Sequence, residues 1–121
     1  MIVKHAGDAE RVTMREGMHR RILIGDSDRA QNFIMRLFEV DNGTEVKCHI
    51  HPWEHEIFVL EGIGAVMSSE GREIEVSPGS VLYMPAGEKH AMINKGANVL
   101  KFLCIIPKVI DESEVTGVDC Q

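Results

Sequence analysis

The chain has 121 residues, a mass of 13.5 kDa and a formal net charge of −6, which is the size of one domain. Hydrophobic residues make up 44% and charged residues 26%, a mixture that excludes disordered and collagen-like architectures. Nucleic-acid binders usually carry a basic patch that replaces the counterions of phosphate. The acidic balance therefore predicts no nucleic-acid partner.

Apolar segments and cysteines bear on the compartment. No apolar run approaches the roughly 18 residues that a membrane helix needs, and residues 1–12 lack the apolar stretch of a signal peptide. Cys48, Cys104 and Cys120 are too few and too scattered for a disulfide framework. We expect a cytoplasmic protein with no membrane partner.

Short β-type runs follow one another along the chain. The expected strands cover residues 20–24, 32–40, 44–50, 55–60, 63–67, 72–76, 80–84, 89–94 and 98–106. Turn signals such as Asp41-Asn42-Gly43 and Ser77-Pro78-Gly79 separate them, and no segment shows a sustained helical period. This pattern predicts an all-β fold, a sandwich or a barrel.

Alternation within two of these runs predicts which side chains face inward. In residues 98–106 the inward set is Leu100, Phe102, Cys104 and Ile106. In residues 32–40, Arg36 and Glu39 fall on opposite faces. Either both faces are partly covered or one of these charges lines a cavity, and the pattern leaves both alternatives open.

Four of the six histidines form the most informative pattern. His49 and His51 are two residues apart in an expected strand, so their side chains project from one face with Cα atoms about 6.5 Å apart. His55 opens the next expected strand after a break, and His90 follows a turn. A lone H-x-H is a weak signal, but three close histidines and a fourth after a turn favour a metal site over isolated structural histidines.

The spacing around these histidines resembles the two motifs of the cupin superfamily. Residues from Gly43 to Gly62 resemble the first motif, G-x5-H-x-H-x3/4-E-x6-G, and residues from Gly79 to Asn94 match the second, G-x5-P-x-G-x2-H-x3-N, at every fixed position. The resemblance implies one cupin β-barrel domain, a jelly roll or double-stranded β-helix, over residues 1–121. Its expected parts are N-terminal strands in 1–31, a core at about 32–107 and a C-terminal tail at 108–121.

The sequence departs from the first motif where that motif has glutamate. His55 is separated from Gly62 by the required six residues, whereas Glu56 is separated from it by five. We therefore expect His55 to be the ligand and Glu56 to face the other way, with Glu56 as the alternative ligand.

The stretch HIHPWEHEIFVLEG also resembles small four-histidine, manganese-binding cupins of bacteria. That resemblance implies one divalent metal per chain, with manganese favoured and iron, nickel or zinc as alternatives. The implied ligands are His49, His51, His55 and His90.

Four neutral imidazoles would leave the full +2 charge on the ion, which favours anionic or enolate-like ligands. An octahedral ion would keep two open positions, expected to be cis. Barrel parity predicts a small, mostly apolar pocket lined by Ile57, Val59, Phe102 and Cys104. We expect no role for Cys48, and we expect Cys104 to be either a buried hydrophobe or a thiol near the metal.

These features predict a metal-binding cupin with oxygenase-type chemistry on a small organic molecule, a dioxygenase-like oxidoreductase. The alternatives are a non-redox metal-dependent isomerase or lyase, and a small-molecule-binding protein without turnover. No residue is assigned as the general acid or base. The expected strands at residues 20–24 and 32–40 are apolar and are the candidates for an open edge of the barrel. Because an open edge leaves backbone groups unpaired, we expect it to pair with a second copy of the chain and form a homodimer.

Overall fold

The computed structural model describes residues 1–108 and 111–120 and consists almost entirely of β-strands. In chain order the strands are β1 (Val12–Arg15), β2 (Met18–Ile24), β3 (Phe33–Val40), β4 (Glu45–Ile50), β5 (His55–Glu61), β6 (Gly64–Met67), β7 (Glu73–Val76), β8 (Val81–Met84), β9 (His90–Asn94), β10 (Leu100–Pro107) and β11 (Thr116–Gly117). Three short 3-10 helices are η1 (Ala6–Asp8), η2 (Asp26–Asp28) and η3 (Glu112–Glu114). The predicted all-β fold is confirmed, and within the described residues no helix is long and apolar enough to cross a membrane.

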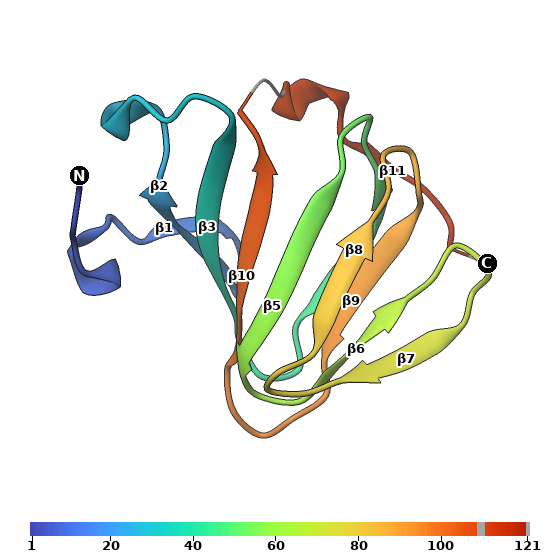
Figure 1. The fold of residues 1–121 in the computed structure, drawn as a ribbon. Helices are drawn as coiled ribbons and strands as arrows, with labels where there is room; N and C mark the ends of the chain where they lie inside the picture. Colours follow the sequence, from blue (N-terminus) through green and yellow to red (C-terminus); the bar gives the residue numbers. More distant parts are fainter. Residues whose placement is uncertain (109–110, 121) are drawn as a thin grey trace.

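The strands form two antiparallel sheets that face each other as a jelly roll (Figure 1). One sheet has the order β1-β2-β3-β10-β5-β8 and the other β11-β4-β9-β6-β7. The nine predicted strands are all present, whereas β1 and β11 were missed. Both missed strands are short and fully exposed, so they lack the alternation that reveals a half-buried strand. They exist because they pair with β2 and β4.

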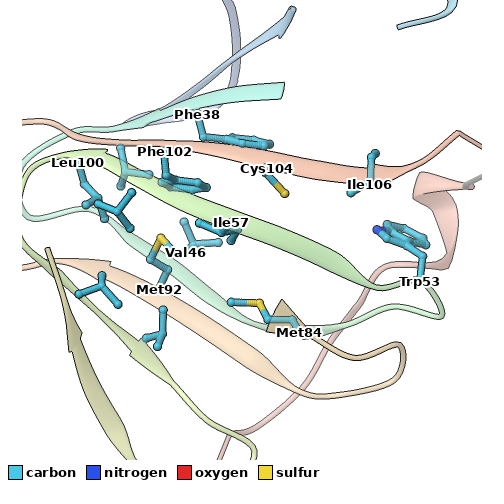
Figure 2. Packing of buried hydrophobic residues seen from close by; sticks show 14 residues of the cluster. Phe38, Val46, Trp53, Ile57, Met84, Met92, Leu100, Phe102, Cys104 and Ile106 are labelled. Carbon is cyan, nitrogen blue, oxygen red and sulfur yellow. The ribbon is translucent and has the colours of Figure 1, made fainter. Parts of the chain in front are cut away.

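The core fills the space between the sheets (Figure 2). The inward set predicted for β10 is confirmed, since Leu100, Phe102, Cys104 and Ile106 are at most 5% exposed. The Phe102 ring stacks on Phe38 of β3 with centroids 5.4 Å apart. Alternation along both strands therefore brings side chains of adjacent strands together on one face.

The two charges of β3 have different surroundings. Glu39 lies within 4 Å of Arg21 and Arg11, with N–O distances of 3.8 and 3.9 Å. Arg36 faces inward, opposite Cys104 of β10, and lines a cavity between the sheets. The structure thus selects the second alternative that the sequence pattern left open.

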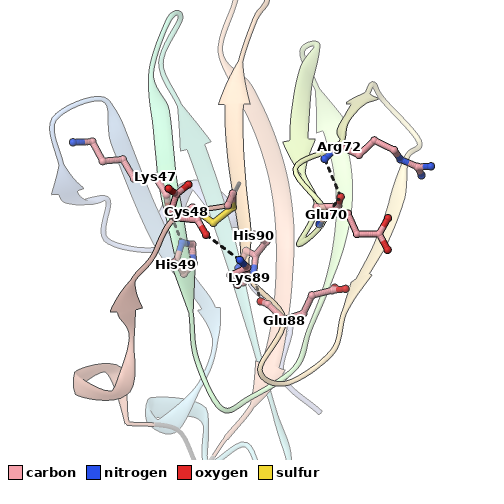
Figure 3. The surroundings of a disulfide bond; sticks show 11 residues. Lys47, Cys48, His49, Glu70, Arg72, Glu88, Lys89 and His90 are labelled. Carbon is pink, nitrogen blue, oxygen red and sulfur yellow. Dashed lines mark hydrogen bonds between the residues drawn. A yellow bond between two sulfur atoms is a disulfide. The ribbon is translucent and has the colours of Figure 1, made fainter.

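The interpretation of the cysteines was wrong in one respect. Cys48 and Cys120 form a disulfide (Figure 3), although no role was expected for Cys48. This bond holds the C-terminal segment against β4, and the Val118 N–H donates to the Cys48 carbonyl at 3.1 Å. The pairing joins residues 72 positions apart and depends on β11, which the sequence pattern did not reveal. Cys104 is the free cysteine of the described residues.

Breaking this disulfide will destabilise the protein. A bond that closes a loop of this length is worth about 4 kcal/mol in the chain-entropy model, and roughly 2–4 kcal/mol in practice. We expect Cys120→Ser to lower the free energy of unfolding by that amount in urea titrations, and a reductant to have the same effect on the unmodified chain but none on the variant. Equal unfolding midpoints for oxidised and reduced protein would contradict the assignment.

Candidate metal centre

Four histidines from three strands and one loop meet at one end of the barrel. His49 on β4 is paired in register with His90 on β9, His51 follows β4, and His55 begins β5. Three of the rings, those of His51, His55 and His90, are at most 8% exposed. The His55 and His90 ring centroids are 4.8 Å apart, and the His49 and His90 centroids 4.3 Å. The fold therefore collects all four histidines that the sequence singled out.

Each of these rings is held through its Nδ1 atom. Nδ1 of His49, His51 and His90 lies 2.8–2.9 Å from a main-chain carbonyl oxygen. The three carbonyls belong to Lys47, Trp53 and Glu88. Because a carbonyl can only accept a hydrogen bond, the N–H of each ring is on Nδ1 and the lone pair is on Nε2. Nδ1 of His55 instead contacts the Cys104 sulfur at 3.1 Å.

The remaining ring nitrogens converge. One ring nitrogen from each of His49, His51 and His90 lies within 4.8 Å of the others, and Nε2 of His55 lies 3.2 Å from Nε2 of His90. Two ring nitrogens at this distance share a proton when Nε2 of His55 carries it, and when it does not, both can bind the same cation. The geometry therefore fits a divalent metal held by His49, His51 and His90, with His55 beside His90 as the candidate fourth ligand. Imidazole is a good ligand for zinc, copper, iron and nickel.

The surroundings keep these rings neutral. Burial is the main cause that lowers the pKa of all four histidines. Together with the neighbouring charges, burial brings the pKa of His55 to about 2 and that of His90 to about 4. A metal-binding imidazole must be deprotonated at the ligating nitrogen, so the rings have the form that metal binding requires.

A cavity of about 270 Å³ opens beside the four rings. Its wall is mainly apolar and includes Met14, Met18, Phe38, Ile57, Met84 and Phe102. Trp53 stacks on His51 with centroids 4.3 Å apart and an interplanar angle of 10°. Of the predicted pocket residues, Ile57, Phe102 and Cys104 line this cavity, whereas Val59 is fully buried in the core behind it.

Several lining residues lie outside the predicted pocket. Met14, Arg15, Met18 and Arg20 come from the β1–β2 hairpin, and Glu112 and Val115 come from the segment that precedes β11. These segments carry no motif, so only their pairing with neighbouring strands places them at the cavity. Alternation in β3 puts Arg36 on the same face as Phe38, and this parity is the signal in the sequence that could have identified Arg36.

His55 and Glu56 lie on opposite faces of β5. His55 is buried and faces the other histidines, whereas Glu56 is exposed on the outer face of the sheet. There Glu56 lines a separate hollow together with Phe33 and Ile105. The arrangement agrees with the expected orientation of both residues and offers no path for Glu56 to reach the cluster.

Cys104 connects His55 on β5 to Arg36 on β3, across the intervening strand β10 of the same sheet. Its sulfur accepts a hydrogen bond from Nη2 of Arg36 at 2.9 Å and contacts Nδ1 of His55 at 3.1 Å. Burial raises the pKa of the thiol, and Arg36 opposes this shift. Cys104 therefore orients His55 through the nitrogen that does not face the cluster.

Of the other two histidines, His5 is exposed and His19 is hydrogen-bonded to Thr13 and Asp41.

Comparison with known proteins agrees with this architecture. Residues 36–106 match the Cupin_2 model, described as a cupin domain. The chain is 33% identical over 84 residues to an oxalate-binding protein of Thermotoga maritima, covering 66% of this chain and 69% of that protein. It is 30% identical over 90 residues to quercetin 2,3-dioxygenase of Bacillus subtilis, covering 74% of this chain but only 26% of the dioxygenase.

Among solved structures, the polyketide cyclase RemF from Streptomyces resistomycificus superposes with a TM-score of 0.89 and 31% identity. The match covers 98% of this chain and 86% of that one. It therefore includes the β1–β2 hairpin and the C-terminal segment, which lie outside the matched family model.

Metal content will separate the two candidate ligands on β5. We expect His55→Ala to reduce bound metal from one ion per chain to well below half, because a buried ligand is lost and Nε2 of His90 loses its neighbour. Glu56→Ala is the matched control on the adjacent residue and should retain the full content, as measured by elemental analysis of protein purified without chelators. Loss of metal with Glu56→Ala and retention with His55→Ala would reverse the assignment.

The histidines also predict how the metal-free protein responds to acid. Their pKa values are lowered in the folded state, so below pH 6.5 the unfolded chain binds protons that the folded chain does not. Stability therefore falls as the pH falls, by roughly 1.4 kcal/mol per pH unit for each of His55 and His90 once the pH is well below 6.5. Urea unfolding of chelator-treated protein between pH 7.5 and 4.5 measures this slope.

His55→Gln removes one of these titrating groups. The slope of the free energy of unfolding against pH should therefore fall by roughly 1.4 kcal/mol per pH unit in this variant. The exposed His5→Gln is the control and should keep the full slope. Parallel curves for the unmodified chain and His55→Gln would contradict the burial of a neutral ring at this position.

Proposed function

This chain belongs to the cupin family, and we propose that His49, His51, His55 and His90 together hold one divalent metal at which a small organic substrate binds through oxygen atoms. The observation that carries the proposal is the fixed orientation of the four rings. Each Nδ1 has a partner, and the other ring nitrogens converge. The resemblance to four-histidine cupins favours manganese, with iron, nickel or zinc as alternatives.

The proposed reaction is a non-redox carbon–carbon ring closure of a substrate with carbonyl groups in a 1,3 relation. A metal held by these residues would supply Lewis acidity that polarises a carbonyl of the substrate. Four neutral ligands leave the whole +2 charge of the ion available for this purpose, whereas a ligating glutamate would cancel one unit. The likeness to the polyketide cyclase over nearly the whole chain supports this choice.

The protein itself would hold the apolar body of the substrate and limit access of water. Phe38, Ile57 and Phe102 form one wall of the cavity, and the β1–β2 hairpin contributes Met14 and Met18 at another. Exclusion of water strengthens electrostatic interactions within the site and protects a reactive enolate from side reactions. A flexible chain of carbonyl groups folded against such walls is brought near the geometry that ring closure needs.

Oxygenase-type chemistry is the second candidate. It is favoured by the identity of 30% with quercetin 2,3-dioxygenase, although this chain spans about a quarter of that protein. Both candidates require the same four-histidine site and a substrate that would bind through oxygen atoms. They differ in whether molecular oxygen is consumed.

A triketone substrate distinguishes these two reactions. Heptane-2,4,6-trione can close by intramolecular aldol condensation with loss of one water to give a dihydroxytoluene. We expect metal-loaded protein to form this product under strict anaerobiosis, at a rate at least about tenfold above that of His55→Ala. Oxygen uptake in step with product formation would favour the oxygenase instead, and absence of product from loaded protein would contradict the cyclase assignment.

The expectation that residues 20–24 or 32–40 form an open edge was wrong, because β2 and β3 lie inside the six-stranded sheet, whose edges are β1 and β8. We propose instead a homodimer formed through the outer face of this sheet. Phe33, Phe58, Val81 and Tyr83 lie on this face and are 45–74% exposed. Exposed apolar patches of this kind mark association surfaces in soluble proteins. Sedimentation equilibrium should give twice the chain mass of 13.5 kDa, and a single species at the chain mass would refute the dimer. Location in the cytoplasm stays a prediction from the sequence.

A further inference from the structure

The cavity beside the histidines is positively charged, although the chain as a whole carries −6. Its wall includes three arginines, Arg15, Arg20 and Arg36. Among the described lining residues, Glu112 is the one carboxylate, and it is paired with Arg20 at 3.1 Å. The charge of this cavity is therefore opposite to that of the surrounding molecule, before any metal charge is counted.

Arg15 is exposed, whereas Arg36 is a partly buried cavity arginine without a counter-ion. Within the described residues, no carboxylate lies at ion-pair distance from its guanidinium. Its Nε atom is buried without a hydrogen-bond partner, and its Nη2 atom donates to the neutral sulfur of Cys104. A guanidinium that is partly removed from water is costly unless it is paired. Its retention on the wall of a cavity indicates that a ligand supplies the missing charge.

A second arginine, Arg20, lines the same cavity. Arg20 of β2 is opposite Phe38 of β3, and Arg36 is two residues from Phe38 on the same strand. The Arg36 guanidinium carbon lies 4.9 Å from the centroid of the Phe38 ring. The Nε atom of Arg20 is also buried without a partner. Arg20 and Arg36 thus both line the cavity on the inner face of the sheet, and each has a buried Nε atom without a hydrogen-bond partner.

The position of Arg36 relates it to the histidines. Only the Cys104 sulfur separates its Nη2 atom from Nδ1 of His55, through contacts of 2.9 and 3.1 Å. A small ligand in the cavity can therefore contact Arg36 at one end and face the histidine cluster at the other. A role limited to holding Cys104 would use one N–H of Arg36 and leave its other donors unused.

We infer that Arg36 binds the carboxylate of an anionic substrate whose carbonyl oxygens face the four histidines. The inference rests on the proposed function and narrows its substrate class to a keto acid with an otherwise apolar body. The guanidinium matches a carboxylate in shape and charge, and such charge-assisted hydrogen bonds are stronger than neutral ones. Arg20 adds positive potential at the same wall, which Glu112 partly offsets.

Two probes of matched shape test this inference. They are 4-(3-oxobutanoyl)benzoate and the corresponding benzamide, which share a 1,3-diketone and differ in charge at the far end. Isothermal titration of metal-loaded protein should show at least about tenfold tighter binding of the benzoate. Arg36→Met should weaken binding of the benzoate by at least about tenfold and leave binding of the benzamide within about twofold. Lys101→Met, on the outer face of β10, is the control and should preserve the preference.

Other outcomes overturn the inference. Equal affinity of both probes for the unmodified protein excludes a carboxylate site at Arg36. An equal loss of both probes in Arg36→Met, with metal content unchanged, assigns Arg36 a structural role.

A third measurement separates this inference from the proposed function. If neither diketone binds better to loaded than to chelator-treated protein, the proposed function fails. The anion site is then decided on chelator-treated protein with plain benzoate against benzamide. Binding of benzoate that Arg36→Met abolishes supports the site, and absence of such binding overturns it. The same comparison on chelator-treated protein tests the anion site if Arg36→Met no longer retains metal.

Discussion

The hydrogen bond that each site histidine makes through Nδ1 is the interaction on which the rest of this site depends. An imidazole has two nitrogens, and an acceptor placed at one of them determines which nitrogen carries the lone pair. Carbonyl oxygens of Lys47, Trp53 and Glu88 occupy that position for three rings. Without these contacts the rings could rotate or change tautomer, and their other nitrogens would no longer converge.

Three of these contacts are local, since each acceptor lies two residues from its histidine. They form wherever the chain adopts the strand and turn geometry of this fold. The fourth is different, because His55 depends on Cys104 of β10 and, through it, on Arg36 of β3. Three adjacent strands of the six-stranded sheet therefore join in orienting one ring. This link also places a positive charge near the cluster, so the orientation of His55 and the charge of the cavity have a common origin.

The motifs predicted the site better than alternation predicted its surroundings. The spacing from His55 to Gly62 selected His55 over Glu56, and strand parity then placed them on opposite faces of β5, as found. Gly62 has a positive φ of 90°, and a Cβ atom there would lie 2.5 Å from the Val99 carbonyl oxygen. A backbone requirement of this kind fixes the spacing, so the sequence reveals it.

Features that arise from pairing between distant segments were not predictable. The Cys48–Cys120 disulfide and the contribution of Glu112 and Val115 to the cavity both follow from the docking of β11 on β4. Val59 was assigned to the pocket by parity alone. It shares the inward face with Ile57, but it lies deeper along the strand, where Leu100 and Val40 fill the core. Parity gives the face of a side chain and not its depth in the barrel.

The central claim is that four imidazoles, and neither a carboxylate nor the Cys104 sulfur, hold a metal ion in this protein. X-ray absorption at the metal edge of the loaded protein tests it most directly, because outer-shell scattering counts imidazole rings and sulfur has a distinct first-shell signature. The account predicts four imidazoles and only oxygen in the remaining first-shell positions. A sulfur ligand, or three imidazoles with a protein carboxylate, would contradict it.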